Sequence, residues 1–253
     1  SRLMRMLYKP VKAPLLITDV RSAELIKHAS NSFLALKISF INAVSRICDR
    51  AGADVVKVAQ GMGLDQRIGK SFLKAGAGYG GSCFPKDVAA FAWISKIKGY
   101  HFKLLDEIHA INEEQKAEII KKIKDIVWNL QGKTVSILGL SFKPDTDDLR
   151  NAPSLDIIRL LLDAGVSVKA HDPVCMERVQ AMFPAVQFDA DIYAVLRDSD
   201  CLLLITEWRE YRTLNFKRIK SIMRSLNVVD GRNLYDPQKI KKAGFMYRGV
   251  GRQ

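Results

Sequence analysis

A long stripe of apolar residues near the start of the chain constrains the fold more than any other feature. Between Ser22 and Arg50, apolar side chains recur every three or four residues, which is the period of an α-helix. The stripe covers about eight helical turns. Thr18 and Asp19 are candidate caps at its start, and Gly52 is a candidate stop. We therefore expect one long helix with a wide buried face.

The other patterns in the first half of the chain are also helical. A short helix is expected over 54–61. A further helix, over 85–98, begins with a proline and stops before Gly99, the usual placement of these residues at helix ends. Residues 103–130 predict another long helix, whose length is typical of an element that packs against a partner. Residues 1–131 are thus expected to form an all-helical domain that dimerises.

The pattern changes near residues 131–133. Beyond this point short apolar runs alternate with helical stretches, and the runs occupy 134–140, 166–173, 201–206, 227–231 and 245–251. Nearly continuous apolar strands that alternate with helices predict a parallel sheet covered on both faces. Residues 132–253 are therefore expected to form a doubly wound, Rossmann-like α/β domain. Ligands on such sheets bind beyond the carboxyl ends of the strands. The loops at those ends follow Leu140, His171, Thr206 and Asp230.

The composition limits the cellular compartment expected for the chain and the class of molecule that it is expected to bind. No stretch is apolar enough for a membrane span, and the first residues lack the apolar core of a secretory signal. The four cysteines lie far apart with no C-x-x-C pair, so we expect no disulfides, no metal site and a reducing, cytoplasmic location. The net charge of +13 fits nucleic acid or phosphate-bearing small molecules. No helix carries a basic stripe with interleaved aromatic residues, so a nucleic-acid partner is not expected.

One glycine pattern in the chain resembles a dinucleotide-binding motif without its context. Gly76, Gly78 and Gly81 form a G-x-G-x-x-G sequence. The motif binds a dinucleotide only after a strand and before the helix of a βαβ unit, whereas here it follows a helical region. The first strand of the second half continues without a second and third glycine. Neither half therefore carries an NAD fingerprint.

These glycines instead predict a flexible loop that ends at Cys83. A thiol at the start of a helix meets free N–H groups and the positive end of the helix dipole, which favour the thiolate. Lys86 adds positive charge, and Asp87 lies four residues after the cysteine. A lone cysteine is otherwise a small buried apolar residue, which is our interpretation of the other three. We expect Cys83 to be a reactive thiol.

Two further groups of polar residues are candidates, and a solvated surface is the competing interpretation of both. Lys27 and Asn31 are four residues apart and share one face of the long helix. The loop after the first strand carries a cluster of charged residues, where such folds place charges that face phosphate: Lys143, Asp145, Asp147, Asp148 and Arg150. The pattern alone leaves both alternatives open for each group.

Several long motifs resemble the UDP-glucose/GDP-mannose dehydrogenase family, and within it the UDP-glucose 6-dehydrogenases. They are AELIKHASNSFLALKISFIN at 23–42, LDQRIGKSFLKAG at 64–76, GYGGSCFPKD at 78–87 and ILGLSFKPDTDDLRNAPS at 137–154, followed by ITEWREY, DGRN and GVGR. Their order and spacing extend the resemblance over essentially the whole chain. The GDP-mannose branch shares the GGSC loop, so GDP-mannose is the nearest alternative substrate.

The resemblance implies a four-electron oxidation of UDP-glucose to UDP-glucuronate, with NAD as cofactor and a covalent cysteine intermediate. It assigns the nucleophile to Cys83, stabilisation of the oxyanion to Lys27, and positioning of water and of the groups around it to Asn31 and Asp87. The residues that it implies for binding UDP-glucose are Arg67, Phe72, Leu73, Lys74, Ala75, Gly76, Gly80, Lys143 and Arg232. Those that it implies for contact with NAD are Lys86 and Arg150.

The sequence departs from the family pattern at its start. Members of the family begin with an NAD-binding domain and a catalytic glutamate, and this sequence starts beyond both. We therefore expect a piece of a longer protein that binds UDP-glucose but does not oxidise it alone. A non-catalytic UDP-sugar-binding module and a nucleic-acid-binding protein are the alternatives from other classes.

The resemblance also implies a homodimer through the helical half. The apolar stripe of residues 22–50 is more than a region of this size can cover alone, and two-fold dimers are the commonest closed assembly. Arg67 is expected to reach the UDP-glucose pocket of the partner subunit. Arginine suits this position because its planar guanidinium can pair with two diphosphate oxygens at once.

Overall fold

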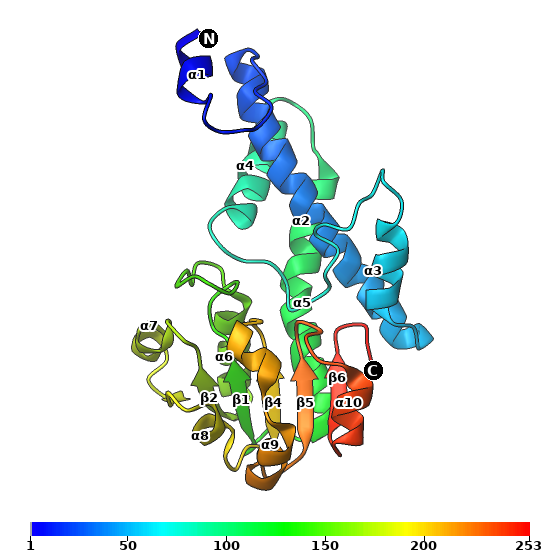
Figure 1. Ribbon diagram of the computed structural model, residues 1–253, viewed down its shortest axis with the longest axis vertical. Coiled ribbons are helices and arrows are strands. Elements are labelled where there is room, and N and C mark those ends of the chain that lie inside the picture. The colour runs from blue at the N-terminus through cyan, green and yellow to red at the C-terminus, as the bar shows by residue number, and fades with distance from the viewer. Residues whose placement is uncertain (1) are drawn as a thin grey trace.

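The structure is a computed structural model that describes residues 2–253. These residues form a helical part and a sheet part (Figure 1). The helical part contains α1 (Arg2–Leu7), α2 (Val20–Ala51), α3 (Val55–Gly63), α4 (Phe84–Ile97) and α5 (Lys103–Val127). The long helix predicted over 22–50 is confirmed as α2, which has 32 residues. It forms the axis on which α3, α4 and α5 are arranged.

Local hydrogen bonds set both ends of α2. The Asp19 carboxylate accepts from the backbone N–H of Ser22 at 3.0 Å, which satisfies one of the free N–H groups of the first turn. At the other end Gly52 has φ +69°, the left-handed conformation that ends many helices. Asp19 and Gly52 are therefore the cap and the stop that the sequence predicted.

The helix predicted over 103–130 ends earlier, at Val127. Trp128 has φ +65°, which lies outside the helical region of backbone conformation, and the residue is 92% exposed. The turn that follows buries Leu130 and leads into the first strand. Periodicity alone extends the helix too far because the apolar pattern continues through this turn.

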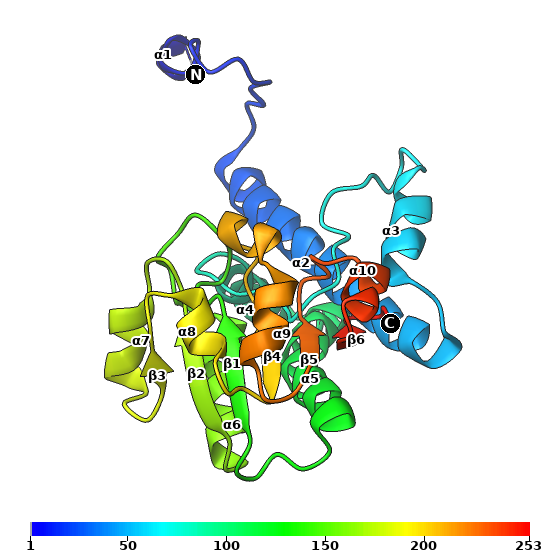
Figure 2. The same ribbon diagram turned by 60° about the horizontal axis from the view of Figure 1, so that its bottom comes forward.

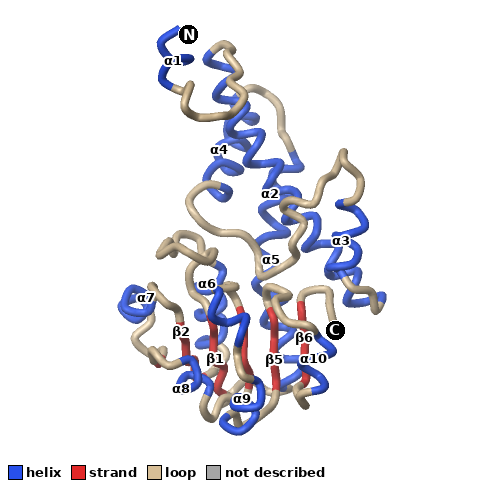
Figure 3. The backbone as a smooth tube through the Cα atoms, in the orientation of Figure 1, coloured by secondary structure: helices blue, strands red, loops and turns tan. Residues whose placement is uncertain are grey.

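The sheet is parallel throughout, and its strands lie in the order β3-β2-β1-β4-β5-β6 (Figure 2). They lie together at the end of the molecule opposite α1 (Figure 3). The strands are β1 (Thr134–Leu138), β2 (Ser167–His171), β3 (Gln187–Phe188), β4 (Cys201–Leu204), β5 (Asn227–Asp230) and β6 (Met246–Gly249). The helices of this part are α6 (Pro153–Asp163), α7 (Met176–Met182), α8 (Ile192–Leu196), a 3-10 helix (Arg209–Thr213), α9 (Phe216–Ile222) and α10 (Pro237–Lys242). The predicted doubly wound, Rossmann-like fold is confirmed, whereas the short strand β3 was not predicted.

Helices cover both faces of the sheet. Along β4, Cys201 and Leu203 belong to one apolar cluster, and Leu202 and Leu204 belong to the other, because successive side chains of a strand point to opposite faces. The first cluster includes residues of α5, α6 and α7, and the second includes residues of α8, α9 and α10 (Figure 2). Since α5 starts in the helical part, the core runs continuously across residues 131–133. A boundary between two domains at that point stays a prediction.

The end of the chain returns to the helical part. The carbonyl of Gly251 accepts from the backbone N–H of Val55 at 2.9 Å, and Arg252 Nε lies 3.0 Å from Asp54 Oδ2. Gly251 has φ +64°, and a Cβ there would lie 2.6 Å from the Cβ of Ser45. The tail therefore holds the start of α3 beside the sheet, where α3 faces the carboxyl ends of the strands.

Candidate functional site

The segment between α3 and α4 crosses the carboxyl ends of the strands. Its backbone is held at Gly76, whose N–H donates to Asn42 Oδ1 and whose carbonyl accepts from Gln115 Nε2, both at 2.9 Å. The N–H of Ala77 donates to the carbonyl of Gly231 at 2.9 Å, in the loop after β5. The segment is thus bonded to α2, to α5 and to the sheet.

Glycines allow the next part of this segment to lie against the loop after β1. A Cβ on Gly80 would overlap the carbonyl oxygen of Asn151. Gly81 has φ +81°, and its N–H donates to the carbonyl of Arg150 at 2.7 Å. The element before this loop is α3 rather than a strand, so the G-x-G-x-x-G sequence lacks the context of a dinucleotide fingerprint, as predicted.

Cys83 occupies the N-cap position of α4 and is exposed to solvent. Its carbonyl accepts from the backbone N–H of Asp87 at 2.9 Å. The other three cysteines, Cys48, Cys175 and Cys201, are buried. Burial raises the pKa of each of these thiols, to about 12 for Cys175 and Cys201. Cys83 is therefore the accessible thiol among the described residues.

Asp87, one turn into α4, is fully buried and joins α4 to α2. Its Oδ2 accepts from Asn31 Nδ2 at 2.5 Å, and its Oδ1 lies 3.0 Å from Lys86 Nζ. Burial alone would raise the pKa of Asp87. The hydrogen bond from Asn31, the ion pair with Lys86 and the nearby positive charge of Lys27 outweigh burial and hold the pKa below its usual value. The carboxylate is thus ionised at neutral pH, and Asn31 faces α4 rather than solvent.

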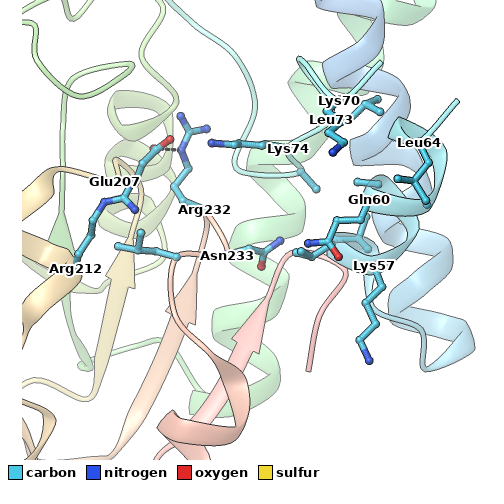
Figure 4. A pocket seen from close by; sticks show the side chains of 16 residues that line it. Lys57, Gln60, Leu64, Lys70, Leu73, Lys74, Glu207, Arg212, Arg232 and Asn233 are labelled. Atoms are coloured by element: carbon cyan, nitrogen blue, oxygen red, sulfur yellow. Dashed lines mark hydrogen bonds and ion pairs between the residues drawn. The ribbon is translucent and has the colours of Figure 1, made fainter. Parts of the chain in front are cut away.

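Two adjoining pockets lie between α3, the segment after it and the loops that follow β4 and β5. Figure 4 shows the larger one, which has a volume of about 850 Å³, and the smaller has about 440 Å³. The residues that line both are Lys70, Lys74, Ala75, Glu207 and Arg232. The larger pocket extends along α3, and the smaller reaches Phe84, the residue after Cys83.

The walls of the two pockets are strongly basic. Their charged residues are Lys57, Lys70, Lys74, Lys143, Arg212 and Arg232, with Glu207 as the single acid. Lys143 Nζ lies over the ring of Phe142, 5.3 Å from its centroid. Cations around a concave site concentrate anions and bind phosphate oxygens. The volume of the larger pocket falls in the range of about 300–1,000 Å³ that small-molecule sites occupy.

Family models match both parts of the chain. The central domain of the UDP-glucose/GDP-mannose dehydrogenase family matches residues 21–114, and the UDP binding domain of the same family matches residues 136–237. The chain belongs to the UDP-glucose/GDP-mannose dehydrogenase family. The family resemblance of its sequence motifs is therefore confirmed.

Individual proteins of the family are similar over nearly the whole chain. UDP-glucose 6-dehydrogenase TuaD of Bacillus subtilis is 45% identical over 97% of the chain, and UDP-glucose 6-dehydrogenase of Rhizobium meliloti is 40% identical over 98%. A solved UDP-glucose dehydrogenase from Pyrobaculum islandicum is 37% identical, with a TM-score of 0.90 over 100% of the chain. The chain spans 54% and 58% of the two curated relatives and 56% of the solved chain.

Most of the residues that the family resemblance implies for binding the nucleotide sugar line the pockets. They are Phe72, Leu73, Lys74, Ala75, Gly80, Lys143 and Arg232. Gly76 lies behind them, where a Cβ would be 3.1 Å from Arg232 Nη1. Arg67 lines neither pocket: it is exposed, and its Nη2 lies 2.7 Å from Asp65 Oδ2. Within one chain, the structure thus separates Arg67 from the rest of this set.

The residues implied for catalysis form a second group beside the two adjoining pockets, which together are called the basic groove. Asn31 and Asp87 are joined by their hydrogen bond, and Lys27 contributes its charge to the same carboxylate. Cys83 starts the helix that carries Asp87. None of these four residues lines the two pockets. Phe84, the residue after Cys83, lines the smaller pocket and so connects the two groups along the chain.

The loop after β1 lacks the free N–H groups that a dinucleotide's pyrophosphate would meet. In dinucleotide-binding folds the pyrophosphate lies against free N–H groups after the first strand. Here the N–H groups of Leu140 and Ser141 donate to Asp172 Oδ2 at 2.7 and 3.2 Å, so a side chain of the protein already occupies them. Lys86 and Arg150, the residues implied for NAD, lie instead beside the start of α4. Arg150 is exposed, and Lys86 pairs with Asp87.

Several residues of the site were not singled out by the sequence. Glu207 and Lys70 line both pockets, and Arg212 lines the larger one. His28 Nδ1 lies 3.9 Å from Asp87 Oδ1. Glu207 follows β4 within the ITEWREY motif, so the strand-end rule pointed to its loop but not to its side chain.

Residues 2–253 contain neither a membrane-spanning helix nor a metal-binding cluster. Every helix there is too short or too polar to cross a bilayer. These residues also contain no group of three His, Cys, Asp or Glu side chains that could hold a metal ion.

Proposed function

We propose that this chain binds UDP-glucose and carries the nucleophile of an NAD-dependent dehydrogenase that oxidises UDP-glucose to UDP-glucuronate. The observation that carries the proposal is the position of Cys83, an exposed thiol at a helix N-terminus next to Phe84, which lines a basic groove. Relatives named UDP-glucose 6-dehydrogenase support this substrate over GDP-mannose.

The basic groove would hold the diphosphate of the nucleotide sugar. Lys74 and Arg232 line both pockets, and Lys143 lines the smaller one. Arginine can pair with two phosphate oxygens at once, whereas lysine supplies a compact charge that follows the ligand. The smaller pocket extends from these cations to Phe84. A diphosphate bound there would direct the attached sugar toward Cys83.

The covalent chemistry of this chain would begin with attack of the Cys83 thiolate on a C6 aldehyde. The thiol is exposed at the N-cap position of α4. Lys27 would stabilise the oxyanion that develops on the former carbonyl oxygen. The chain's part would end when water cleaves a Cys83 thioester, with Asn31 and Asp87 positioning that water. NAD⁺ supplies the oxidising power when bound, and Lys86 and Arg150 are the residues of this chain proposed to meet it.

We propose in addition that the chain forms a homodimer through α2. The apolar residues Ile26, Phe33, Phe40 and Ile47 occur at seven-residue intervals along α2 and are 47%, 61%, 48% and 63% exposed. Seven residues are close to two helical turns, so these side chains form one exposed stripe. Burial of such a stripe by a second copy would remove apolar surface from water. The exposed position of Arg67 agrees with a role in the partner subunit's pocket.

Calorimetric titration of UDP-glucose and of UDP into the 253-residue chain tests the proposed ligand. We expect saturable binding of both and weaker binding of GDP-mannose. At about ten times Kd, UDP-glucose should raise the free energy of unfolding by about 1.4 kcal/mol. An oligonucleotide should not stabilise the chain. Absence of UDP binding, or stabilisation by the oligonucleotide alone, would overturn the proposal.

A turnover assay tests whether this chain alone oxidises UDP-glucose. Since the N–H groups after β1 are already bonded to Asp172, we expect no NADH when NAD⁺ and UDP-glucose are added to this chain alone. Formation of NADH at a rate that Cys83→Ser abolishes would contradict this expectation, although it would support the proposed nucleophile.

A further inference from the structure

Glu207 and Arg232 form an ion pair where the two pockets adjoin. Glu207 lies three residues beyond β4 and Arg232 lies two residues beyond β5, and these strands are parallel neighbours. Arg232 Nε–H donates to Glu207 Oε2 at 2.6 Å, as the dashed line in Figure 4 shows. The exposed fractions of the Arg232 and Glu207 side chains are 19% and 22%. The two residues therefore form a largely buried ion pair that belongs to both pockets.

Charge alone does not explain an acid at this position. Glu207 is the single acid on walls that carry six cations. Burial would raise the pKa of Glu207, but the charge and hydrogen bond of Arg232, with a smaller contribution from Lys74, hold the pKa below its usual value. The carboxylate is thus negative at neutral pH and repels an anionic ligand. Its contribution to a phosphate site must be geometric.

The geometry of Arg232 shows what that contribution is. The hydrogen bond to Glu207 uses Nε alone. Within residues 2–253, the terminal nitrogens Nη1 and Nη2 of Arg232 donate to no other side chain or carbonyl. The side chain passes over Gly76, where a Cβ would lie 3.1 Å from Nη1 and 2.9 Å from the carbonyl oxygen of Gly231. One side of the guanidinium is therefore held, and the other is open to a ligand.

We propose that Glu207 is a positioning residue that holds the guanidinium of Arg232 with both terminal nitrogens directed at the phosphate oxygens of a bound nucleoside diphosphate. The inference rests on the proposed function for the identity of the ligand. A long arginine side chain loses rotamer freedom when it binds, and restraint before binding reduces this loss. Glu207 thereby increases affinity through orientation, despite its unfavourable charge.

Three variants of Glu207 separate orientation from charge. Glu207→Gln removes the charge but keeps an oxygen that can accept from Arg232 Nε. Glu207→Asp keeps the charge but withdraws the carboxylate by one methylene, and Glu207→Ala removes both. Titration of UDP into each folded chain should give a Kd within about threefold of wild type, or lower, for Glu207→Gln. The Kd should rise about tenfold for Glu207→Asp and for Glu207→Ala, the loss expected for a charge-assisted hydrogen bond.

A double-mutant cycle with Arg232→Ala tests whether Glu207 acts through the arginine. In the Arg232→Ala background, Glu207→Ala should not weaken UDP binding further, because no guanidinium remains to be oriented. A purely structural role would weaken binding in both backgrounds and would lower the melting temperature equally. If Glu207→Ala does not fold, the opposite effects of the Gln and Asp variants still decide the question.

The outcomes also separate this inference from the proposed function. If the wild-type chain does not bind UDP, both fail. If the wild type binds UDP and Glu207→Gln is as weak as Glu207→Ala, only the inference fails, because an oxygen that accepts from Arg232 Nε is then not what orients the guanidinium. Equal weakening by Glu207→Ala with and without Arg232 also overturns the inference.

Discussion

Asn31 Nδ2 donates a hydrogen bond to Asp87 Oδ2 at 2.5 Å, across 56 positions of sequence and between the helices α2 and α4. The carboxylate that accepts this bond is buried and lies one turn away from an exposed thiol. It also fixes the face of α2 that carries Lys27 against the start of α4. The candidate catalytic residues are thus held by two packed helices.

Replacement of Asp87 by asparagine should destabilise the chain in a pH-dependent way. The pKa of Asp87 is lower in the folded chain than its usual 3.8, so its ionised form stabilises the fold above that pH, and the stabilisation is lost as the pH falls through the folded value. We expect Asp87→Asn to lower the free energy of unfolding by about 2 kcal/mol at neutral pH. Urea unfolding at several pH values should show the difference from wild type shrinking below pH 3.8.

The control for this experiment is Asp125→Asn, which changes an exposed carboxylate on α5. It should leave the free energy of unfolding nearly unchanged at each pH. A difference between Asp87→Asn and wild type that stays constant down to the lowest pH would show that the charge of Asp87 does not contribute to stability.

Cys83 should be alkylated before any other cysteine. It is exposed at the N-cap of α4, whereas Cys48, Cys175 and Cys201 are buried and burial raises the pKa of each. Since the thiolate is the reactive form, brief treatment with iodoacetamide followed by peptide mapping should label Cys83 at least about tenfold faster than the others. UDP-glucose should slow the labelling. Equal labelling of Cys201, or no protection by UDP-glucose, would contradict the proposed site.

Arg67 should contribute to the pocket of a second copy of the chain. Arg67→Ala should raise the Kd for UDP-glucose about tenfold through loss of a charge-assisted contact, while light scattering still shows a dimer of nearly unchanged melting temperature. A mixture of Arg67→Ala with Lys143→Ala chains tests the sharing of pockets. In a statistical mixture of dimers, about a quarter of the pockets should regain both residues and high affinity.

The outcomes of the mixing experiment are distinct. Recovery of high-affinity sites shows that pockets are shared between subunits. A dimer without recovery would mean that Arg67 acts within its own chain or not at all. A monomeric wild type would contradict the proposed dimer. Phe40→Glu provides a monomeric reference because it places a charge in the exposed stripe of α2.

Gly80 should not tolerate a side chain, although another glycine near the groove should. A Cβ on Gly80 would overlap the carbonyl oxygen of Asn151, whereas a Cβ on Gly61 would meet no atom within 4 Å. We expect Gly80→Ala to lower the free energy of unfolding by about 1–3 kcal/mol through overpacking, and to weaken UDP binding. Gly61→Ala lies within α3 and should stabilise the chain by about 0.5–1 kcal/mol. Chemical denaturation measures both, and similar effects of the two substitutions would refute the close contact at Gly80.

Local features of this chain could be predicted because they depend on neighbouring residues. The cap at Asp19, the stop at Gly52 and the apolar period of α2 each involve positions only a few residues apart. The alternation of apolar runs with helices was enough for the parallel sheet. The exposed thiol at Cys83 followed from the glycines before it and the helix after it.

Relations between distant segments were decided by the tertiary structure. The pattern of α2 left open whether Asn31 faces solvent, and only the packing of α4 brings Asp87 against it. Similarly, the sequence pointed to the loops after β4 and β5, but the adjacency of these strands decides that Glu207 meets Arg232. The physical reason is that periodicity determines which face of an element is apolar, whereas the partner of a polar side chain depends on which elements pack together.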